Sequence, residues 1–424
     1  MKGKSFVAGL ALLLIAPLGF AYSFLTHETL IDAEWDSSIK PVLLSQYPQA
    51  TPSQLVMARS YAYGGATIQD AGYYPFGHAL FSDLTHYVRT GDFVTNLIRD
   101  SRDINELAFA LGALSHYVGD SDGHRYAINV AVPQEFPGLE KHYGTVVTYE
   151  ENPHAHIRTE FAFDVDQVSQ GRFAPLGYLR HVGFRVPKRL LNQAFYDTYG
   201  ITLRSVLGEE FGVLRSYKWS VRQFLPRVAY AEVLLHRRDM PPDPDTPAFH
   251  DFAARIAQAS RENRWEAYRK HKPSVLTRVV AVLIFIVPKV GPLSDLAIRG
   301  PKTDTEADYA ASVARSNADY AKLLGEVKDN GPKKFDLADV DLDTGYPTRP
   351  GAYNLTDKTY AKLLDRVTHR NARPPLGLRQ NILAFYAVPN APIATKHNPR
   401  QWKKVQAELV VLRAMPPQWI PNAK

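Results

Sequence analysis

Helical spacing of apolar residues constrains the fold of this chain most strongly. In NELAFALGALSHYVGD, residues 105–120, apolar side chains recur every three or four positions, which places them on one face of an α-helix. The stretch VRQFLPRVAYAEVLLHRR, residues 221–238, has much the same spacing around an internal proline. Clear β-strand alternation is scarce. The sequence therefore predicts an all-α protein with long loops.

The first 21 residues have the pattern of a cleaved secretory signal peptide. Lys2 and Lys4 precede an apolar run, and Pro17 precedes a small-residue cleavage site at Ala21. Cleavage there would give a mature chain that begins with the free amino group of Tyr22. The alternative is an uncleaved membrane anchor, for which the apolar stretch is short. We therefore expect an exported protein that is periplasmic or secreted, with or without association with a membrane.

Composition narrows the chemistry of any metal site. The 424 residues include no cysteine, which excludes disulfides, a lipoprotein anchor and thiolate ligands, and leaves nitrogen and oxygen donors. With 45% hydrophobic and 22% charged residues, the chain resembles ordinary folded proteins. Its net charge of +7 falls by two, to +5, when Lys2 and Lys4 are removed. This mild basic excess suits phosphate-bearing substrates or an anionic membrane surface.

The proline-rich stretch MPPDPDTP, residues 240–247, predicts a boundary between two regions. We expect a catalytic domain over residues 22–245 and a mostly helical C-terminal region over residues 246–424. The second region contains an apolar segment flanked by basic residues, near 275–298. Its unbroken apolar core, Val279–Val287, is too short to cross a membrane. This segment could be an interfacial membrane contact or a buried helix.

Histidines and carboxylates concentrate in the first third of the chain. Eight of the 14 histidines lie between Tyr22 and Glu160. His116 with Asp120, and His156 with Glu160, each pair a histidine with a carboxylate one helical turn apart, where both can bind one ion. Imidazole and carboxylate are good zinc ligands, and a carboxylate can bridge two ions. One such pair usually marks a solvated surface, but two pairs with further histidines and an aspartate upstream predict a cluster of metal ions.

Other catalytic motifs are missing. HETLI, residues 27–31, begins like the metalloprotease helix His-Glu-x-x-His but has isoleucine in place of the second histidine. The sequence also contains no glycine-rich loop that would hold phosphate.

The order of these residues resembles the zinc-dependent phospholipase C and S1/P1 nuclease family, and most closely its phospholipase C branch with exported bacterial members. The resemblance covers roughly residues 22–163 and implies an all-α domain that holds three zinc ions. It implies that the first ion is held by Asp70, His86, His116 and Asp120. The second would be held by His124, His156 and Glu160, and the third by the amino group and carbonyl of Tyr22, by His27, and by Asp120 as a bridge.

Two roles within this ligand set have alternatives. The resemblance implies that Asp70 is also the general base, or the residue that positions the attacking water. His154 is an alternative to His156, although only His156 stands one helical turn before Glu160.

Clustered zinc ions would make water acidic enough to ionise near neutral pH and would neutralise phosphate oxygens, so hydrolysis of a phosphate ester is expected. Aromatic residues near Asp70 could hold a quaternary ammonium group, stack a nucleobase, or merely pack between helices; they are Tyr61, Tyr63, Tyr73, Tyr74 and Phe76.

Three functions remain open. The first is a phospholipase C that releases diacylglycerol and a phosphorylated head group, which the segment near 275–298 favours. The others are an exported single-strand nuclease and a non-catalytic surface-binding relative.

Overall fold

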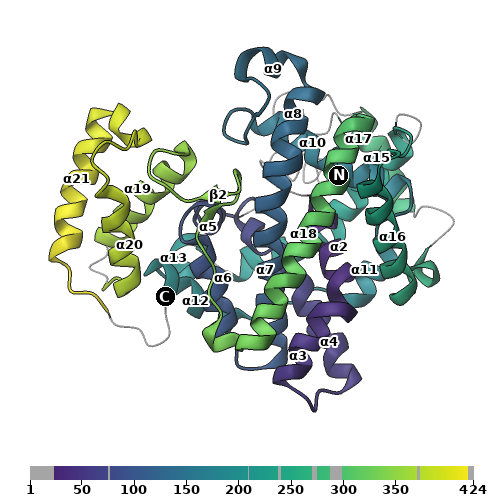
Figure 1. Ribbon diagram of the computed structural model, residues 1–424, viewed down its shortest axis with the longest axis horizontal. Coiled ribbons are helices and arrows are strands. Elements are labelled where there is room, and N and C mark those ends of the chain that lie inside the picture. Colours follow the sequence, from purple (N-terminus) through teal and green to yellow (C-terminus); the bar gives the residue numbers. More distant parts are fainter. Residues whose placement is uncertain are drawn as a thin grey trace, which may run out of the picture.

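The computed structural model describes residues 23–74, 77–208, 210–236, 240–269, 275–286, 298–369 and 373–418. Helices form nearly all of its regular structure, which confirms the all-α class (Figure 1). Within the described residues, the paired strands are β1 (Val340–Asp341) and β2 (Tyr346–Pro347), which form a short antiparallel hairpin with Val340 opposite Pro347.

The described helices up to residue 236 make up the region in which the metal ligands were predicted. They are α2 (Phe24–Glu34), α3 (Lys40–Gln46), α4 (Pro52–Gly65), α5 (Ala79–Tyr87), α6 (Thr90–Asp100), α7 (Ile104–Gly123), α8 (Asn129–Glu135), α9 (Pro137–Tyr143), α10 (Pro153–Ser169), α11 (Leu176–Val182), α12 (Lys188–Tyr199), α13 (Leu203–Leu207), α14 (Glu210–Trp219) and α15 (Leu225–His236).

The remaining helices follow the proline-rich stretch. They are α16 (Pro247–Glu262), α17 (Val275–Ile286), α18 (Thr303–Asn330), α19 (Asn354–Thr368), α20 (Leu376–Tyr386) and α21 (Pro399–Ala414).

The central helix of the fold is α7, which lies behind α18 in Figure 1 and packs against it. Asp103 caps its N-terminus by accepting hydrogen bonds from the backbone N–H groups of Asn105 and Glu106, both at 2.9 Å. At its other end α7 continues into a π-helical turn, His124–Ile128, and then into α8. Such turns are frequent at functional sites, and this one begins at a predicted ligand.

Two glycines let α4 and α7 approach closely. A Cβ atom on Gly65 would lie 2.0 Å from the carbonyl oxygen of Phe109, and one on Gly112 would lie 2.1 Å from that of Ala62. Neither position has room for a side chain. The close approach brings the carbonyl of Ala66, at the end of α4, to 3.0 Å from Nδ1 of His116.

The C-terminal region packs directly on the N-terminal one. Both α16 and α18 pack against α2, and the group of α19, α20 and α21 lies on the left of Figure 1, where α19 contacts α5. The predicted boundary falls in the non-helical residues 240–246. Because α18 also packs on α7, the division at residue 245 into two domains stays a prediction.

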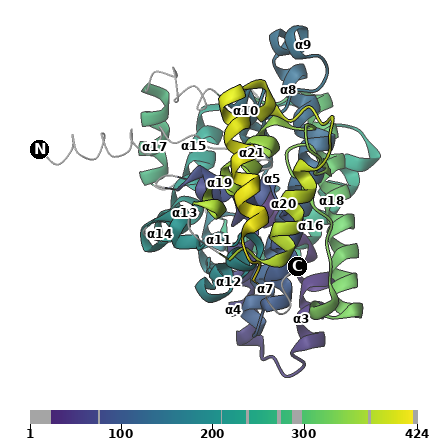
Figure 2. The same ribbon diagram turned by 90° about the vertical axis from the view of Figure 1, so that its left-hand side faces the viewer.

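Some predicted features fall outside the described residues. These are the signal peptide, Tyr22, Phe76 and most of the apolar segment after Ile286. The helix α17 forms the start of that segment and packs against α15 at the edge of the molecule (Figure 2). None of the helices in the described part of the chain combines the length and the hydropathy needed to cross a membrane.

Candidate metal centre

The structure brings together all eight predicted ligands that it describes. Their ligand atoms fall into three groups, and within each group they lie within 4.8 Å of one another. All eight residues are at least 97% buried. The groups are His27 with His116 and Asp120; Asp70 with His86 and His116; and His124 with His156 and Glu160.

Asp120 faces two of these groups at once. Its Oδ2 atom lies 3.1 Å from Nε2 of His86 and 3.1 Å from Nε2 of His116. Its other oxygen, Oδ1, lies 3.2 Å from Nε2 of His27. This arrangement is what a carboxylate that bridges two ions requires.

Asp70 approaches the same two histidines from another element. Its Oδ1 lies 3.4 Å from Nε2 of His86 and 3.9 Å from Nε2 of His116. Asp70 belongs to a single 3-10 turn, Gln69–Gly72. The amide of Gln69 ties this turn to α7 by donating to the carbonyl of Ala113 at 3.0 Å. The turn therefore holds Asp70 against the helix that carries His116.

Three histidines are oriented by backbone carbonyls. Nδ1 of His86 is 2.8 Å from the carbonyl oxygen of Ser82, Nδ1 of His116 is 3.0 Å from that of Ala66, and Nδ1 of His124 is 2.7 Å from that of Leu342. An imidazole that donates from Nδ1 presents the lone pair of Nε2 to the cluster. This pattern is typical of histidines that bind metal.

His156 uses its other nitrogen. Its Nδ1 lies 2.6 Å from Oε1 of Glu160, while its Nε2 lies 2.8 Å from the amide oxygen of Asn129. Nε2 of His124 lies 3.7 Å from the same oxygen of Glu160. The alternative ligand His154 is exposed, so the burial pattern favours His156.

The start of α2 is fixed beside the group of His124, His156 and Glu160. Asp164, one turn beyond Glu160 on α10, accepts a hydrogen bond from the backbone N–H of Leu25 at 3.0 Å and another from the hydroxyl of Thr26 at 2.7 Å. These bonds hold the helix that carries His27. Since Tyr22 lies outside the described residues, its part in a third site remains a prediction.

The buried donor atoms fit a group of zinc ions. Among the described residues, several of them lack a hydrogen bond of normal geometry: both oxygens of Asp70, both oxygens of Asp120, Nε2 of His124 and Oε2 of Glu160. Leaving such groups unsatisfied in the interior is costly, and cations would satisfy them. Five imidazoles and three carboxylates, with no thiolate, form a donor set suited to zinc.

The pKa shifts agree with this fit. Burial, followed by the charges of Asp120 and Asp70, raises the pKa of the Glu160 carboxyl well above its ordinary value. Burial, together with His124, lowers the pKa of His156 well below its ordinary value. Burial opposes the ionisation of Asp120, yet His116, with His27 and His86, holds its pKa well below the ordinary value. A bound cation would replace protons in such a cluster.

Most of the aromatic residues near Asp70 pack between helices. Tyr63 is buried and its hydroxyl donates to Asp32 at 2.7 Å, while Tyr74 is buried against Tyr217 with ring centroids 5.4 Å apart. Tyr73 differs, because its ring centroid lies 5.6 Å from that of His86. The ring of Tyr73 therefore borders the cluster.

Three contributors were missed by the sequence analysis. The carbonyl of Leu342 contacts His124, and the amide oxygen of Asn129 contacts His156. The carbonyl of Asp343 orients Asn129 by accepting a hydrogen bond from its amide. Alternating aspartates in DVDLDTG, residues 339–345, were an available signal for a site near the hairpin. The role of a particular backbone carbonyl, however, cannot be recognised from a sequence, because every residue has one.

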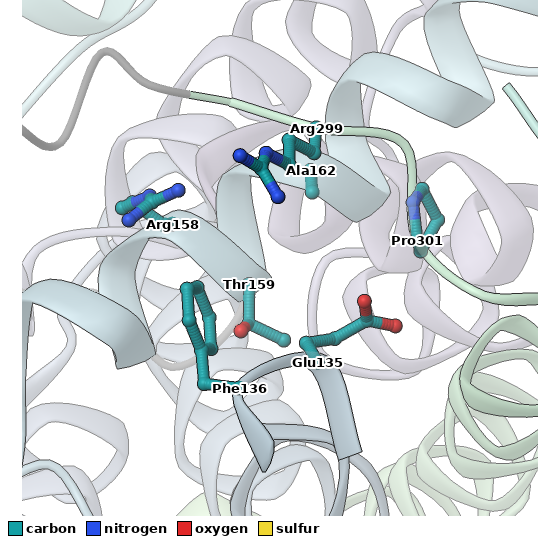
Figure 3. Close-up of a pocket in the computed structure, with 7 residues that line it drawn as sticks. All are labelled: Glu135, Phe136, Arg158, Thr159, Ala162, Arg299 and Pro301. Atoms are coloured by element: carbon teal, nitrogen blue, oxygen red, sulfur yellow. The ribbon is translucent and has the colours of Figure 1, made fainter. Parts of the chain in front are cut away.

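A separate cavity on the other side of α10 does not belong to this centre. Arg158, two positions from His156 on α10, faces away from the ligands. The cavity encloses about 70 Å³. This is small beside the 300–1,000 Å³ or so of typical ligand sites. Figure 3 shows the two arginine side chains above Phe136 and Glu135; the lining residues are Glu135, Phe136, Arg158, Thr159, Ala162, Arg299 and Pro301.

Another cluster of possible metal ligands, on the C-terminal helices, is already neutralised by a lysine side chain. Asp365, His369 and Glu408 lie close enough to hold an ion, but Nζ of Lys404 is 2.7 Å from Oδ1 of Asp365. The lysine ammonium group therefore supplies the positive charge there.

Comparison with known proteins identifies the region that carries the centre. Residues 26–209 match the model of a family described as zinc dependent phospholipase C. This span includes all eight described ligands and ends before the C-terminal region. No match was found among curated proteins or among solved structures. Residues 26–209 of the chain are therefore similar to the zinc dependent phospholipase C family, which supports the predicted resemblance.

Proposed function

We propose that this protein is an exported zinc-dependent phosphodiester hydrolase that cleaves phospholipid into diacylglycerol and a phosphorylated head group. The observation that carries the proposal is Asp120, whose two oxygens face His27 on one side and His86 with His116 on the other. A carboxylate placed in this way would join two ions into one centre. The family of residues 26–209 supports the same type of chemistry.

The ligands divide into three sites in this proposal. Asp70, His86, His116 and Asp120 would hold one ion, and His124, His156 and Glu160 a second. The third would be held by His27, by Asp120, and by the amino group and carbonyl of Tyr22. Export is part of the proposal, since removal of residues 1–21 would create that amino group. Sequencing of the mature N-terminus tests this step.

Zinc ions bound there supply Lewis acidity to a phosphate ester and make water acidic enough to ionise near neutral pH. The chain itself supplies orientation and proton transfer. Water would attack phosphorus in line with the bond to the glycerol oxygen, and that bond would break. The departing oxygen would keep the electron pair and take up a proton from solvent, which gives the hydroxyl of diacylglycerol. We assign Asp70 as the group that positions the water and accepts its proton, because its carboxylate is buried without a hydrogen bond of normal geometry.

Phospholipid is favoured over nucleic acid by the surface of α17. On this helix the side chains of Val279 and Val282 are 41% and 59% exposed, and Arg278 beside them is also exposed. Exposed aliphatic groups next to a basic residue suit a peripheral contact with a phospholipid surface. In the proposal, residues 275–298 make this contact and bring the protein to its substrate.

Turnover by the processed, zinc-loaded protein tests the proposal. Phosphatidylcholine vesicles and single-stranded DNA are offered in parallel, with and without a chelator. The proposal expects release of phosphocholine that stops when the chelator is added. Cleavage of DNA alone would contradict it and assign the protein to the nuclease branch. If zinc-loaded protein cleaves neither substrate, the phospholipase proposal is wrong and a non-catalytic binding role replaces it.

A further inference from the structure

The β1–β2 hairpin lies against the metal centre, although it is outside the residues that match the family. The backbone N–H of Leu342 donates to the carbonyl of His86 at 3.0 Å, and the carbonyl of Leu342 lies 2.7 Å from Nδ1 of His124. Gly345 closes the hairpin with φ of +67°, and a Cβ atom there would lie 2.3 Å from the carbonyl oxygen of Ser121. The hairpin is thus pressed onto α7 immediately after Asp120.

The carbonyl of Leu342 decides which nitrogen of His124 can bind metal. A carbonyl oxygen only accepts, so Nδ1 of His124 must carry the proton and donate it. Nε2 then keeps its lone pair, on the side that faces Glu160. A backbone group from the C-terminal region therefore sets the tautomer of a predicted ligand.

A second carbonyl of the hairpin acts on His156 through Asn129. The amide nitrogen of Asn129 donates to the carbonyl of Asp343 at 2.7 Å. This bond turns the amide oxygen of Asn129 towards His156, whose Nε2 lies 2.8 Å away. Nε2 of His156 must then donate, which leaves the lone pair of Nδ1 facing Glu160 at 2.6 Å.

The side chain of Asp343 fastens the hairpin in this position. Its Oδ2 accepts hydrogen bonds from the hydroxyls of Tyr87 and Tyr353, each at 2.8 Å. Tyr87 follows His86 on α5, and Tyr353 directly precedes α19. The carboxylate is buried, so the two bonds are shielded from water. Both carbonyls that orient the histidines are held within one residue of this attachment.

We infer that the C-terminal hairpin completes the metal centre, with Asp343 as the positioning residue that fixes His124 and His156 for one ion. The inference rests on the proposed zinc centre and extends it beyond the residues that match the family. The side chains of His116 and His86 are oriented at Nδ1 by the carbonyls of Ala66 and Ser82, which lie outside the hairpin. Loss of the hairpin contacts should therefore weaken one zinc site selectively.

Stepwise zinc affinity of the full chain tests this, measured by competition with a chelator. One variant combines Tyr87→Phe with Tyr353→Phe, which removes both hydrogen bonds to the carboxylate of Asp343. A second is Asn129→Leu, which removes the hydrogen bonds of the Asn129 side chain to Asp343 and His156 but keeps those of Tyr87 and Tyr353. The matched control is Tyr360→Phe, a buried tyrosine whose hydroxyl bonds Asn381 at 2.9 Å instead. Loss of partners that orient metal ligands costs about 10- to 100-fold in affinity, so one zinc equivalent should weaken by that factor in both variants.

The outcomes separate the inference from the proposed function. Weakening of one equivalent, with the others and the control at wild-type affinity, supports the inference. Wild-type affinity at every equivalent in both variants would overturn it and leave the zinc centre standing. Equal weakening of all equivalents together with a lower melting temperature would also overturn it, because the contacts would then only support the fold. A wild-type chain that binds no zinc would overturn both.

Discussion

His27 and Asp120 face each other across 3.2 Å, through the carboxylate oxygen that does not point at His86 or His116. His27 comes from α2 and Asp120 from α7, so the contact joins the start of the described chain to the central helix. The ring of His27 also stacks on that of His116, with centroids 4.3 Å apart. The carboxylate of Asp120 thus connects the ligand group of His27 with that of His86 and His116, so a change at Asp120 should affect both.

Substitution of Asp120 by Asn should remove zinc from two sites together. The amide can coordinate through one oxygen only and carries no charge, so the bridge is lost. We expect at least about a 100-fold loss of affinity at both sites, at or above the top of the range for partners that only orient ligands. Zinc content after dialysis measures this, with Glu140→Gln, an exposed carboxylate on α9, as the control. Retention of all the zinc would show that Asp120 bridges nothing.

Substitution of Asp70 by Asn should lower turnover and weaken the ion that Asp70 shares with His86, His116 and Asp120. The variant keeps the size of the side chain but loses the group assigned to accept a proton, which is worth about 10²- to 10⁴-fold in kcat. The ion held by His124, His156 and Glu160 should remain bound. Phosphocholine release and zinc content are measured together, and Asp329→Asn on the exposed end of α18 is the control. Full kcat in the Asp70 variant would exclude its role as the base.

The pair of Glu306 and Asp166 should make stability depend on pH. Burial, followed by Asp166, raises the pKa of Glu306 to about 9, and Arg172 binds both carboxylates at 2.9 and 3.0 Å. The folded chain then holds a proton that the unfolded chain has lost, so stability falls as pH rises from about 5 towards 9, at a slope on the order of 1 kcal/mol per pH unit.

Chemical denaturation at several pH values measures that slope. Glu306→Gln removes the titrating group and should flatten the dependence, while Asp329→Asn on the same helix should leave it. An equally steep slope in the Glu306 variant would mean that another group is responsible.

The contact between α4 and α7 should not tolerate a larger residue. Gly112→Ala places a methyl group 2.1 Å from the carbonyl oxygen of Ala62, and we expect a loss of at least about 2 kcal/mol in the free energy of unfolding. Gly325→Ala on α18 is the control, because nothing lies within 4 Å of its added Cβ. That change should stabilise the helix by up to about 1 kcal/mol. Equal stability of the two variants would contradict the packing described for Gly112.

The valines of α17 should contribute to binding of phospholipid vesicles. Changing Val279 and Val282 together to Ser removes aliphatic surface that is about half exposed, and we expect roughly tenfold weaker binding to anionic vesicles in sedimentation. The matched control changes Val410 and Val411, which are 63% and 46% exposed on α21. Equal weakening in both double variants would show that α17 has no special part in the contact.

Local spacing made much of the centre predictable. His116 with Asp120, and His156 with Glu160, are pairs within single helices, so a helical prediction already places both members on one face. The side chains of His27, Asp70 and His86 required the resemblance to a family, because their meeting depends on how separate helices pack.

The contribution of the hairpin was not predictable in this way. Leu342 acts through its backbone, and Asn129 acts through an amide whose orientation depends on a carbonyl more than 200 residues away. The packing of α18 on α7 likewise joins the two predicted regions without any local pattern. Contacts of this kind depend on tertiary structure, which the spacing of apolar residues along the sequence does not predict.

The number of zinc ions per processed chain distinguishes a three-zinc centre from a cluster of side chains that binds no metal. Elemental analysis of protein purified in metal-free buffer and reloaded with a slight excess of zinc gives this number. The three-site account predicts three ions in the mature chain that begins at Tyr22, and two when an added residue blocks its amino group. A mature chain that retains no zinc after reloading would contradict the account, because the buried carboxylates and imidazoles would then form a centre without a metal.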